Sequence, residues 1–463
     1  MVDAMLRQSQ WDLLARDGSH MYAAFSVLNW LEKIFGIRKA GSTPRRELIA
    51  GVTTFVTMSY IVAVNPAILK SAGIPPGPSM VATIATTIFG TLLMGLYANR
   101  PFAIAPYMGE NAFIAFTVVR VLGYSWQTAL AAVFLAGVLF LLLTVLRLRQ
   151  WLVSAIPNAL RNSFAVGIGL FLTFVGLNET GIVHSTSGGA PLQAGNLTSG
   201  PVLLAIGGFL LMAILMIRRF PAAILVGILV TTVIAFITGI TTRPAKWMSL
   251  PPSLGAIAFK LDFSHTLSWK FFPIVLTIFV MAFVDTMGTL IGVSARAGFL
   301  DEHGNLPEIE RPMLADALST IFASLSGTST SGAFIESATG VEAGGRTGLT
   351  AVVVAICFAA TLLFSPFIGS IPAQAYGPAL IVVGLLMLAP ITKIQFDDYT
   401  ELVPAFAVVA LMSFTYNIGI GITAGFVLYP LCKVAGGRWA EVKPGLWLLA
   451  GLSLLFFIFY PYG

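Results

Sequence analysis

The sequence predicts an all-α protein that crosses a membrane many times, and three observations support this fold class. Only 10% of the 463 residues are charged and 57% are hydrophobic, whereas about a quarter of the residues in a soluble domain are charged. The apolar residues form repeated runs of about 17–22, the length a helix needs to cross hydrocarbon about 30 Å thick. Because lipid offers the backbone no hydrogen-bond partners, only a helical bundle fits this pattern. The runs of the first half cover 48–65, 80–97, 127–146, 160–178, 201–217 and 222–240, and the pattern recurs after residue 270.

The N-terminal segment and the charges agree with this fold class. Residues 1–40 predict a cytoplasmic or interfacial segment without a secretory signal. One face of its helix carries Phe25, Leu28, Leu31, Ile34 and Phe35. The net charge of +6 does not indicate nucleic acid, because most basic residues lie at the ends of the apolar runs. With a cytoplasmic N-terminus, fourteen spans place these residues on the cytoplasmic side of an inner or plasma membrane. The exceptions share one external segment and are Arg243, Lys246, Lys260 and Lys270.

Two short internal matches indicate a repeat. Asn111-Ala-Phe-Ile-Ala115 resembles Gly332-Ala-Phe-Ile-Glu336, and Ile156-Pro157 resembles Ile371-Pro372, at nearly equal offsets of 221 and 215 residues. Seven spans per copy is an odd number, so the second copy must be inverted, as is typical of transporters with a site near the midplane. We expect two seven-span repeats over 41–240 and 272–435, a connecting loop over 241–271 and a C-terminal segment over 436–463. In that segment the apolar run 446–460 has marginal length for a further span.

Two segments cannot run as continuous spanning helices. Residues 98–109 contain two prolines and a glycine, and residues 326–332 contain no large side chain. Each is followed by about twelve helix-compatible residues, too few to cross a membrane. In both places we predict a short extended strand and then a half-helix, whose first N–H groups and positive dipole end face a ligand.

Carboxylates in or beside the predicted spans are the main candidate functional groups, because charge at membrane depth is costly. Asp285 lies well inside the predicted span 272–296. Asp316 could serve the site or simply brace the half-helices. Glu336 is expected one turn into the second half-helix, facing a cavity. Glu110 stands at the start of the first half-helix, where it could act as a capping charge.

The other polar residues admit simpler interpretations. Asn111 could read the edge of a heterocycle or serve as an N-cap. Glu342 is expected to pair with Arg346 on the next turn. The histidines lie outside the predicted spans, so proton coupling would depend on carboxyl groups. The two cysteines lie in apolar runs, and we expect no disulfide, metal or other cofactor. The histidines are His20, His184, His265 and His303, and the cysteines are Cys357 and Cys432.

Five motifs between residues 40 and 445 form a specific combination. They are Phe55-Val-Thr-Met-Ser-Tyr-Ile-Val-Ala-Val-Asn-Pro66, Asp285-Thr-Met-Gly-Thr-Leu-Ile-Gly292, Gly327-Thr-Ser-Thr330, Ile335-Glu-Ser-Ala338 and Gly344-Gly-Arg-Thr-Gly-Leu-Thr350. Together they resemble the AzgA-like purine permeases of the nucleobase:cation symporter-2 family. The resemblance implies seven-plus-seven inverted repeats, a core and a gate domain, gate-domain homodimers, and proton-coupled uptake of adenine, guanine or hypoxanthine.

The resemblance also implies roles for single residues. Asp285 matches the substrate and proton acid of the eighth span, Asp316 the supporting acid of the ninth, and Glu336 the base-binding acid of the tenth. Asn111 matches the third-span amide. One departure is Glu110, because many of these permeases have a glycine-rich run without an acid there. The tenth-span region also lacks the Gln-x-Asn-x-Gly motif of the nucleobase–ascorbate branch, so xanthine, urate and ascorbate are not expected as main substrates.

These observations predict a purine:proton symporter rather than an enzyme, with Na⁺ less expected than H⁺ as the coupling ion. The purine would stack on an aromatic ring, donate hydrogen bonds to carboxylates and accept them from N–H groups of a half-helix. The predicted substrate-site residues are Asp285, Glu336, Asn111, Gly332, Ala333, Phe113 and Tyr376. The predicted proton-coupling or supporting residues are Asp285, Asp316, Glu336 and Glu110.

Three other functions fit less well. A carrier of sulfate or bicarbonate could share the architecture, but Glu336 would repel an anion. An intramembrane aspartyl protease using Asp285 and Asp316 would need a Gly-x-Gly-Asp motif, which Leu314-Ala-Asp-Ala lacks. A channel would need a ring of acids, and no repeat of that kind is present in the sequence.

Overall fold

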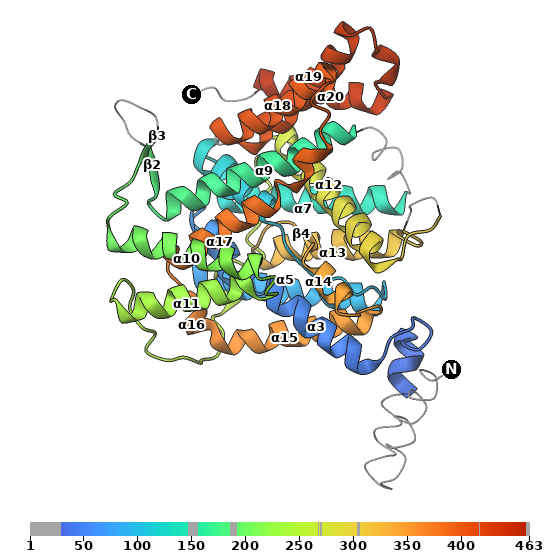
Figure 1. The fold of residues 1–463 in the computed structure, drawn as a ribbon. Helices are drawn as coiled ribbons and strands as arrows, with labels where there is room; N and C mark the ends of the chain where they lie inside the picture. Colours follow the sequence, from blue (N-terminus) through green and yellow to red (C-terminus); the bar gives the residue numbers. More distant parts are fainter. Residues whose placement is uncertain are drawn as a thin grey trace.

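The described chain is almost entirely helical, with two pairs of short strands (Figure 1). A computed structural model describes residues 29–146, 156–185, 192–266, 268, 271–302, 306–415 and 417–459. Within them, nine helices are long and apolar enough to cross a membrane, accompanied by three shorter apolar helices. The chain is therefore a helical membrane protein, as predicted. The expected N-terminal helix is seen over 29–35, while Phe25 and Leu28 lie outside the described residues.

Prolines and a threonine set where the first helices begin. Pro44 and Pro76 occupy the first turns of α3 and α5, where a missing N–H breaks no helical bond. The Thr43 side chain caps α3 by accepting a hydrogen bond from the Arg46 N–H. The elements of the first half are α3 (Pro44–Met58), α4 (Ile61–Lys70), α5 (Pro76–Leu96), β1 (Ile104–Pro106), α6 (Met108–Ala112), η2 (Phe113–Val121), α7 (Trp126–Val145), α9 (Asn158–Glu179), β2 (Val183–Ser185), β3 (Leu192–Ala194), α10 (Gly200–Ile217) and α11 (Ala223–Ile237).

A segment without long helices joins α11 to the second half and lies against the ends of other helices. Phe259 N–H donates to the Leu325 carbonyl at 2.7 Å, and Asp262 N–H donates to the Gln127 carbonyl at 3.2 Å. The elements that follow are η3 (Leu254–Ala256), α12 (Phe272–Ala297), α13 (Glu310–Ser326), β4 (Ser331–Ala333), α14 (Ser337–Glu342), α15 (Gly348–Thr361), η4 (Leu362–Phe364), α16 (Ser365–Gly369), α17 (Ala373–Leu386), η5 (Ala389–Lys393), α18 (Tyr399–Phe414), α19 (Ile418–Ala435), η6 (Trp439–Glu441) and α20 (Pro444–Phe459).

The two halves meet in an antiparallel strand pair, β1–β4, inside the bundle (Figure 1). A threonine fastens each strand to the helix before it. Thr91 on α5 accepts from the Ile104 N–H at 2.9 Å and donates to the Ile104 carbonyl at 3.1 Å. Thr320 on α13 makes the same two bonds with Ser331, at 3.3 and 2.8 Å. The predicted order of strand and then short helix is confirmed in both halves.

Two details of the predicted repeat are wrong. Asn111 lies in the helix α6 while Gly332 lies in the strand β4, so the first internal match aligns positions with different structures. Such matches arise easily between apolar segments, because these use few types of residue. The second short helix, α14, has six residues rather than about twelve, because the chain stays extended or turned up to Glu336. The second match does mark equivalent places, since Pro157 and Pro372 are the N-cap residues of α9 and α17.

The helices pack in two groups that differ in their neighbours. The first group packs around the strand pair and comprises α3, α5, α7, α12, α13, α14 and α15. The second group comprises α9, α10, α11, α17, α18 and α19, with α20 against α19. Contacts between the groups are fewer; they include those of α6 with α9, of η2 with α19 and of α12 with α19 and α20. The first short helix therefore lies at the seam between the two groups.

Glycines allow a close helix crossing in the second group, between α9 and α17. A Cβ atom at Gly169 would lie 2.7 Å from the Gly384 carbonyl oxygen, and one at Gly176 would lie 2.7 Å from the Gly377 carbonyl oxygen. No side chain fits at such distances, so glycine is needed at these positions for the backbones to touch. Gly169 follows Pro157 by twelve residues, just as Gly384 follows Pro372.

Candidate functional site

Four predicted acids lie around the strand pair and the short helices that follow it, and each comes from a different element. Glu110 is in α6, Asp285 in α12 and Asp316 in α13, while Glu336 is the N-cap residue of α14. The hydroxyl of Tyr107, which follows β1, interacts electrostatically with the carboxyl groups of the first three. The structure thus brings together groups from both halves of the sequence.

Tyr107 occupies the space that Gly332 leaves open in β4. A Cβ atom at Gly332 would lie 2.6 Å from Tyr107 Cζ, so any side chain there would displace the ring. The Tyr107 ring stacks with that of Phe334, with centroids 6.3 Å apart, and its hydroxyl is 3.0 Å from the Thr286 hydroxyl. Gly332 is therefore needed to seat a tyrosine, and its predicted contact with a substrate stays a prediction.

Asp316 braces the second strand. Its Oδ2 accepts a hydrogen bond of 3.0 Å from the Ala333 N–H, while its buried Oδ1 has no hydrogen-bond partner in the described chain. This bond joins α13 to the end of β4, so one of the two predicted alternatives for Asp316 is observed directly. Because its N–H is engaged in this way, Ala333 would need its carbonyl group or side chain to contact a ligand.

Glu336 is held by a tyrosine that the sequence analysis missed. The Tyr60 hydroxyl donates a hydrogen bond of 2.6 Å to Glu336 Oε1. Tyr60 is only 2% exposed and lies at the break between α3 and α4, whereas Glu336 is half-buried. Glu336 precedes α14 instead of lying one turn inside it, so that expectation was wrong. The signal for Tyr60 was present, because this residue lies within the first of the five resemblance motifs, between Phe55 and Pro66.

Asp285 lies on a face of α12 that borders open space. Asp285 is half-buried, and one turn later Gly288 is exposed, with no atom within 4 Å of a Cβ placed on it. A further turn along, a Cβ at Gly292 would lie 3.9 Å from Ile335 Cδ1. Ile335 is 54% exposed and immediately precedes Glu336. The face of α12 that carries Asp285 therefore faces the start of α14, with room beside Gly288 for a ligand.

Asn111 belongs to a buried chain of polar side chains. Its Nδ2 donates to Asn65 Oδ1 at 2.6 Å, and Asn65 Nδ2 donates to Thr83 at 2.7 Å and to Thr328 at 2.9 Å. The Oδ1 of Asn111 is buried without a hydrogen-bond partner in the described chain. The N-cap of α6 is Tyr107, so the simpler interpretation of Asn111 as an N-cap is wrong.

The two aromatic candidates lie on different elements, Phe113 in η2 and Tyr376 in α17. Phe113 is buried and packs against α19, where a Cβ at Gly419 would lie 3.0 Å from Phe113 Cε2. Tyr376 on α17 donates from its hydroxyl to Glu179 Oε2 at 3.1 Å. In this structure the Phe113 ring fills space between helices. Stacking of a base on either ring stays a prediction.

The expected ion pair of Glu342 has a different partner. Glu342 Oε1 is 2.9 Å from Arg296 Nη1 at the end of α12. Arg346 instead donates to the carbonyl groups of Val341 and Gly345, each at 2.7 Å. The prediction of a structural ion pair was right in kind and wrong in partner, because the chain turns after α14 and does not continue as a helix. No group of His, Cys, Asp or Glu suited to a metal ion occurs in the described part of the chain.

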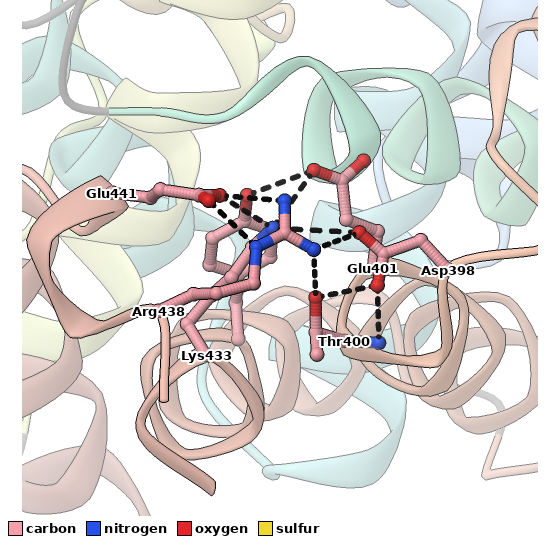
Figure 2. A network of polar contacts seen from close by, with 7 residues as sticks. Asp398, Thr400, Glu401, Lys433, Arg438 and Glu441 are labelled. Atoms are coloured by element: carbon pink, nitrogen blue, oxygen red, sulfur yellow. Dashed lines mark hydrogen bonds and ion pairs between the residues drawn. The ribbon is translucent and has the colours of Figure 1, made fainter. Parts of the chain in front are cut away.

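A second polar network fastens the end of the chain to the second helix group (Figure 2). The Nζ atom of Lys433, fully buried at the end of α19, is 3.1 Å from Glu401 Oε1 and 2.9 Å from Glu441 Oε2. Arg438 is 2.5 Å from Asp398 Oδ2 and 2.6 Å from Glu441 Oε1. Hydrogen bonds from Thr400 and Arg438 lower the pKa of Asp398 to about 2. All these groups have partners within the chain, which is the pattern of a structural network.

Comparisons with known proteins agree with this arrangement. A sequence profile described as the permease family matches residues 45–428. The chain is 40% identical to the adenine permease AdeP of Escherichia coli over 93% of this chain and 96% of the relative. It is 41% identical to the guanine/hypoxanthine permease PbuO of Bacillus subtilis, over 92% of this chain and 99% of the relative.

A solved structure shares the fold at low sequence identity. The transmembrane domain of the cyanobacterial bicarbonate transporter BicA has a TM-score of 0.62 at 16% identity, covering 82% of this chain and 96% of that domain. Identity this low shows the fold alone. On its sequence, over most of its length, the chain belongs to the permease family, together with permeases of adenine and of guanine and hypoxanthine.

Proposed function

We propose that this chain is a secondary active transporter that couples the uptake of a purine nucleobase, namely adenine, guanine or hypoxanthine, to protons. The observation that carries the proposal is the open face of α12, where Asp285 lies opposite the start of α14 with Glu336. Two carboxyl groups that face one space can accept hydrogen bonds from the N–H groups on the edge of a purine. The substrates in the names of AdeP and PbuO support the choice of base.

The roles of the site residues follow from their contacts. Tyr60 occupies Oε1 of Glu336, so the second carboxyl oxygen is available to a base. Asp285 makes the opposite contact from α12, and Asp316 positions β4 without touching the substrate. One carboxyl group of this set, which includes Glu110, would carry the proton. A carboxyl group can take up a proton from water and release it again without any further group.

Pairs of matching contacts support an inverted repeat of two seven-span halves. Thr91 and Thr320 fasten their strands with the same two hydrogen bonds. Gly169 and Gly384, equally far from their capping prolines, touch each other, as residues do when they lie on a two-fold axis. We infer that the first helix group is the core domain and the second the gate domain, and that core and gate move against each other to alternate access.

We further infer an orientation and an assembly. We infer that the protein lies in the inner or plasma membrane. Arg100, Arg218 and Lys393 lie at ends of spans that would face the cytoplasm, and the N-terminus would lie on the same side. The second helix group carries more exposed large apolar side chains than the first. Examples are Leu210 and Ile214 on α10 and Phe406 on α18. A homodimer through this group would cover part of that surface.

The test is uptake of radiolabelled adenine, guanine, hypoxanthine, xanthine and uracil by cells that lack their own permeases. Wild type is compared with Asp285→Asn and Glu336→Gln, each with and without a protonophore. We expect purine uptake that collapses with the protonophore and with either substitution, at wild-type expression. A well-expressed protein that takes up no base, or substitutions without effect, would contradict the proposal. Uptake of bicarbonate or sulfate instead would favour the anion carrier, whose fold BicA shares.

A further inference from the structure

The carboxyl group of Glu110 is buried and has no hydrogen-bond partner among the described residues. Both Oε1 and Oε2 are inaccessible to solvent, and neither makes a hydrogen bond in the described part of the chain. The N–H group of Glu110 itself is near its own carboxyl but lacks hydrogen-bond geometry. The neighbouring Asn111 likewise has an unpartnered and buried Oδ1. One turn of α6 therefore directs three acceptor atoms into the protein without a donor.

The groups that surround Glu110 in the described chain are acidic, neutral polar or apolar, and none of them is basic. On the side of α12, the carboxyl group of Asp285 interacts electrostatically with that of Glu110. The Tyr107 hydroxyl interacts electrostatically with Glu110 and with Asp316 of α13, and it is hydrogen-bonded to the Thr286 hydroxyl. On the side of α9, Ile168 packs against Gly109, where a Cβ would lie 2.8 Å from Ile168 Cγ2. On the side of α4, Asn65 is occupied by Asn111.

An ionised carboxylate is not stable in such surroundings. Burial removes its water, no cation of the described chain acts on it, and the nearby Asp285 repels it. A buried charge in a protein is paired, bound to a metal, or neutralised by a proton. Glu110 has no pairing partner within the described ranges, so the arrangement fits a protonated Glu110. The hydrogen-bonded Glu336 differs, because a donor already satisfies one of its oxygens.

Glu110 also lies where the two helix groups meet. Its helix α6 contacts α9 of the second group and α12 and α4 of the first. Three residues later, Phe113 packs against Gly419 of α19. Any movement of one group past the other must carry Glu110 along the seam. A neutral side chain can pass through an apolar seam, whereas a charged one needs water or a counter-ion at every point.

We propose that Glu110 is the binding site of the transported proton, separate from the acids that bind the base, and that its protonation permits the movement of the two helix groups. One proton from the outer solution converts the Glu110 carboxylate to the carboxylic acid. The neutral seam then moves with the base bound, and the same proton leaves to the inner solution once water reaches Glu110 from that side. The empty transporter returns with Glu110 ionised and hydrated by the water that fills the vacated base site, so one proton enters with each base. This inference rests on the proposed function and specifies which acid of the site couples transport to the proton gradient.

The experiment uses the purified full chain in proteoliposomes and compares wild type with Glu110→Gln. Glutamine has the shape of the protonated acid and cannot release a proton. Two rates are measured with radiolabelled adenine and hypoxanthine: exchange of internal for external base without a gradient, and accumulation driven by an imposed pH difference. We expect Glu110→Gln to keep exchange close to the wild-type rate and to lose accumulation, with loss of the proton influx that a pH dye inside the vesicles reports.

Controls separate coupling from folding and from base binding. Glu308→Gln removes an exposed carboxyl that pairs with Arg311 at the surface and should leave both rates unchanged. Glu336→Gln should lose exchange and accumulation together, because it removes a contact with the base. Glu110→Asp keeps a titratable group and should keep accumulation with a shifted dependence on pH. If Glu110→Gln does not fold, Glu110→Leu replaces it, with the same expected results.

Several outcomes would overturn the inference. Glu110→Gln that accumulates base like wild type would show that the proton binds elsewhere. A folded Glu110→Gln or Glu110→Leu that loses exchange as well would place Glu110 in base binding or structure. Accumulation driven by a sodium gradient and insensitive to the pH difference would replace the proton with Na⁺. Wild-type vesicles that move no purine in either assay would instead refute the proposed function, so the two failures are distinguishable.

Discussion

The Tyr60 hydroxyl donates a 2.6 Å hydrogen bond to Glu336 Oε1 and thereby joins the break in the first span to the start of α14. The two residues are 276 positions apart in the sequence. Tyr60 is buried, so its orientation is set by packing, and the bond fixes one oxygen of a half-buried acid. Glu336 is therefore presented in a defined orientation rather than as a free carboxylate.

Removing this bond should weaken the affinity for the base more than the maximal rate. A hydrogen bond to a charged group contributes about 1.5–3 kcal/mol, and about 1.4 kcal/mol corresponds to tenfold in affinity. We expect Tyr60→Phe to raise the concentration for half-maximal purine uptake by about tenfold. Initial rates over a range of base concentrations measure this. Tyr97→Phe, at an exposed tyrosine at the end of α5, is the control, and equal effects of both substitutions would argue against the proposed role of Tyr60.

The sequence allowed the acids to be found but not most of their partners. Asp285, Asp316 and Glu336 stand out because a charge inside an apolar run is rare and local to detect. The strand and half-helix could be predicted because proline, glycine and small residues exclude a continuous helix. Tyr60 and Thr286 show no such contrast, since both fit an ordinary span. Their roles depend on which spans are neighbours in the fold. Hydrophobic periodicity predicts which face of a helix is buried, but it does not predict which helix packs against that face.

The close approach of Tyr107 to Gly332 predicts that a single methyl group there is harmful. The Cβ of an alanine would overlap the Tyr107 ring, whose Cζ is 2.6 Å from that position. Either the ring or β4 must move, and overpacking of this kind costs about 1–3 kcal/mol. We expect Gly332→Ala to reduce purine uptake about tenfold, since about 1.4 kcal/mol, which lies within this range, is a factor of ten. Uptake and thermal unfolding of the purified protein provide the measurement.

Gly207→Ala is the matched control for that substitution. Gly207 lies in α10, and a Cβ placed there meets no atom within 4 Å. This variant should transport like wild type and unfold at the same temperature or slightly above it, because alanine favours a helix by about 1 kcal/mol over glycine. Normal uptake by Gly332→Ala would mean that the strand pair is more compliant than its contacts suggest.

The polar chain from Thr83 through Asn65 to Asn111 predicts a loss of stability when its middle member is removed. Asn65→Ala would leave Asn111 Nδ2 buried without its 2.6 Å partner. A buried polar group left unsatisfied costs about 1–3 kcal/mol. We expect a lower unfolding temperature together with reduced uptake, because Asn111 is next to Glu110 in α6. Asn178→Ala, at an exposed site near the end of α9, should change neither quantity, and a stable, fully active Asn65→Ala would refute this expectation.

The network of Figure 2 predicts that Lys433 stabilises the fold without taking part in transport. Lys433→Met keeps the length of the side chain but leaves Glu401 without its 3.1 Å partner and Glu441 without one of its two cations. Asp398 and Glu441 would then share Arg438, while Glu401 would keep only the 3.4 Å hydrogen bond from the Tyr429 hydroxyl. The excess of negative charge should lower the unfolding temperature by several degrees. Purine affinity should stay unchanged, because the network touches none of the four acids around the strand pair.

A compensating variant distinguishes this repulsion from a simple loss of packing. Lys433→Met combined with Glu441→Gln removes one negative charge along with the lysine, so it should recover part of the lost stability if charge imbalance is the cause. If packing were the cause, the second substitution would add a further loss, because Glu441 also pairs with Arg438 at 2.6 Å. Lys393→Met, at an exposed lysine in η5, controls for removing a positive charge from the protein as a whole. The sign of the change between the single and the double variant therefore decides between the two causes.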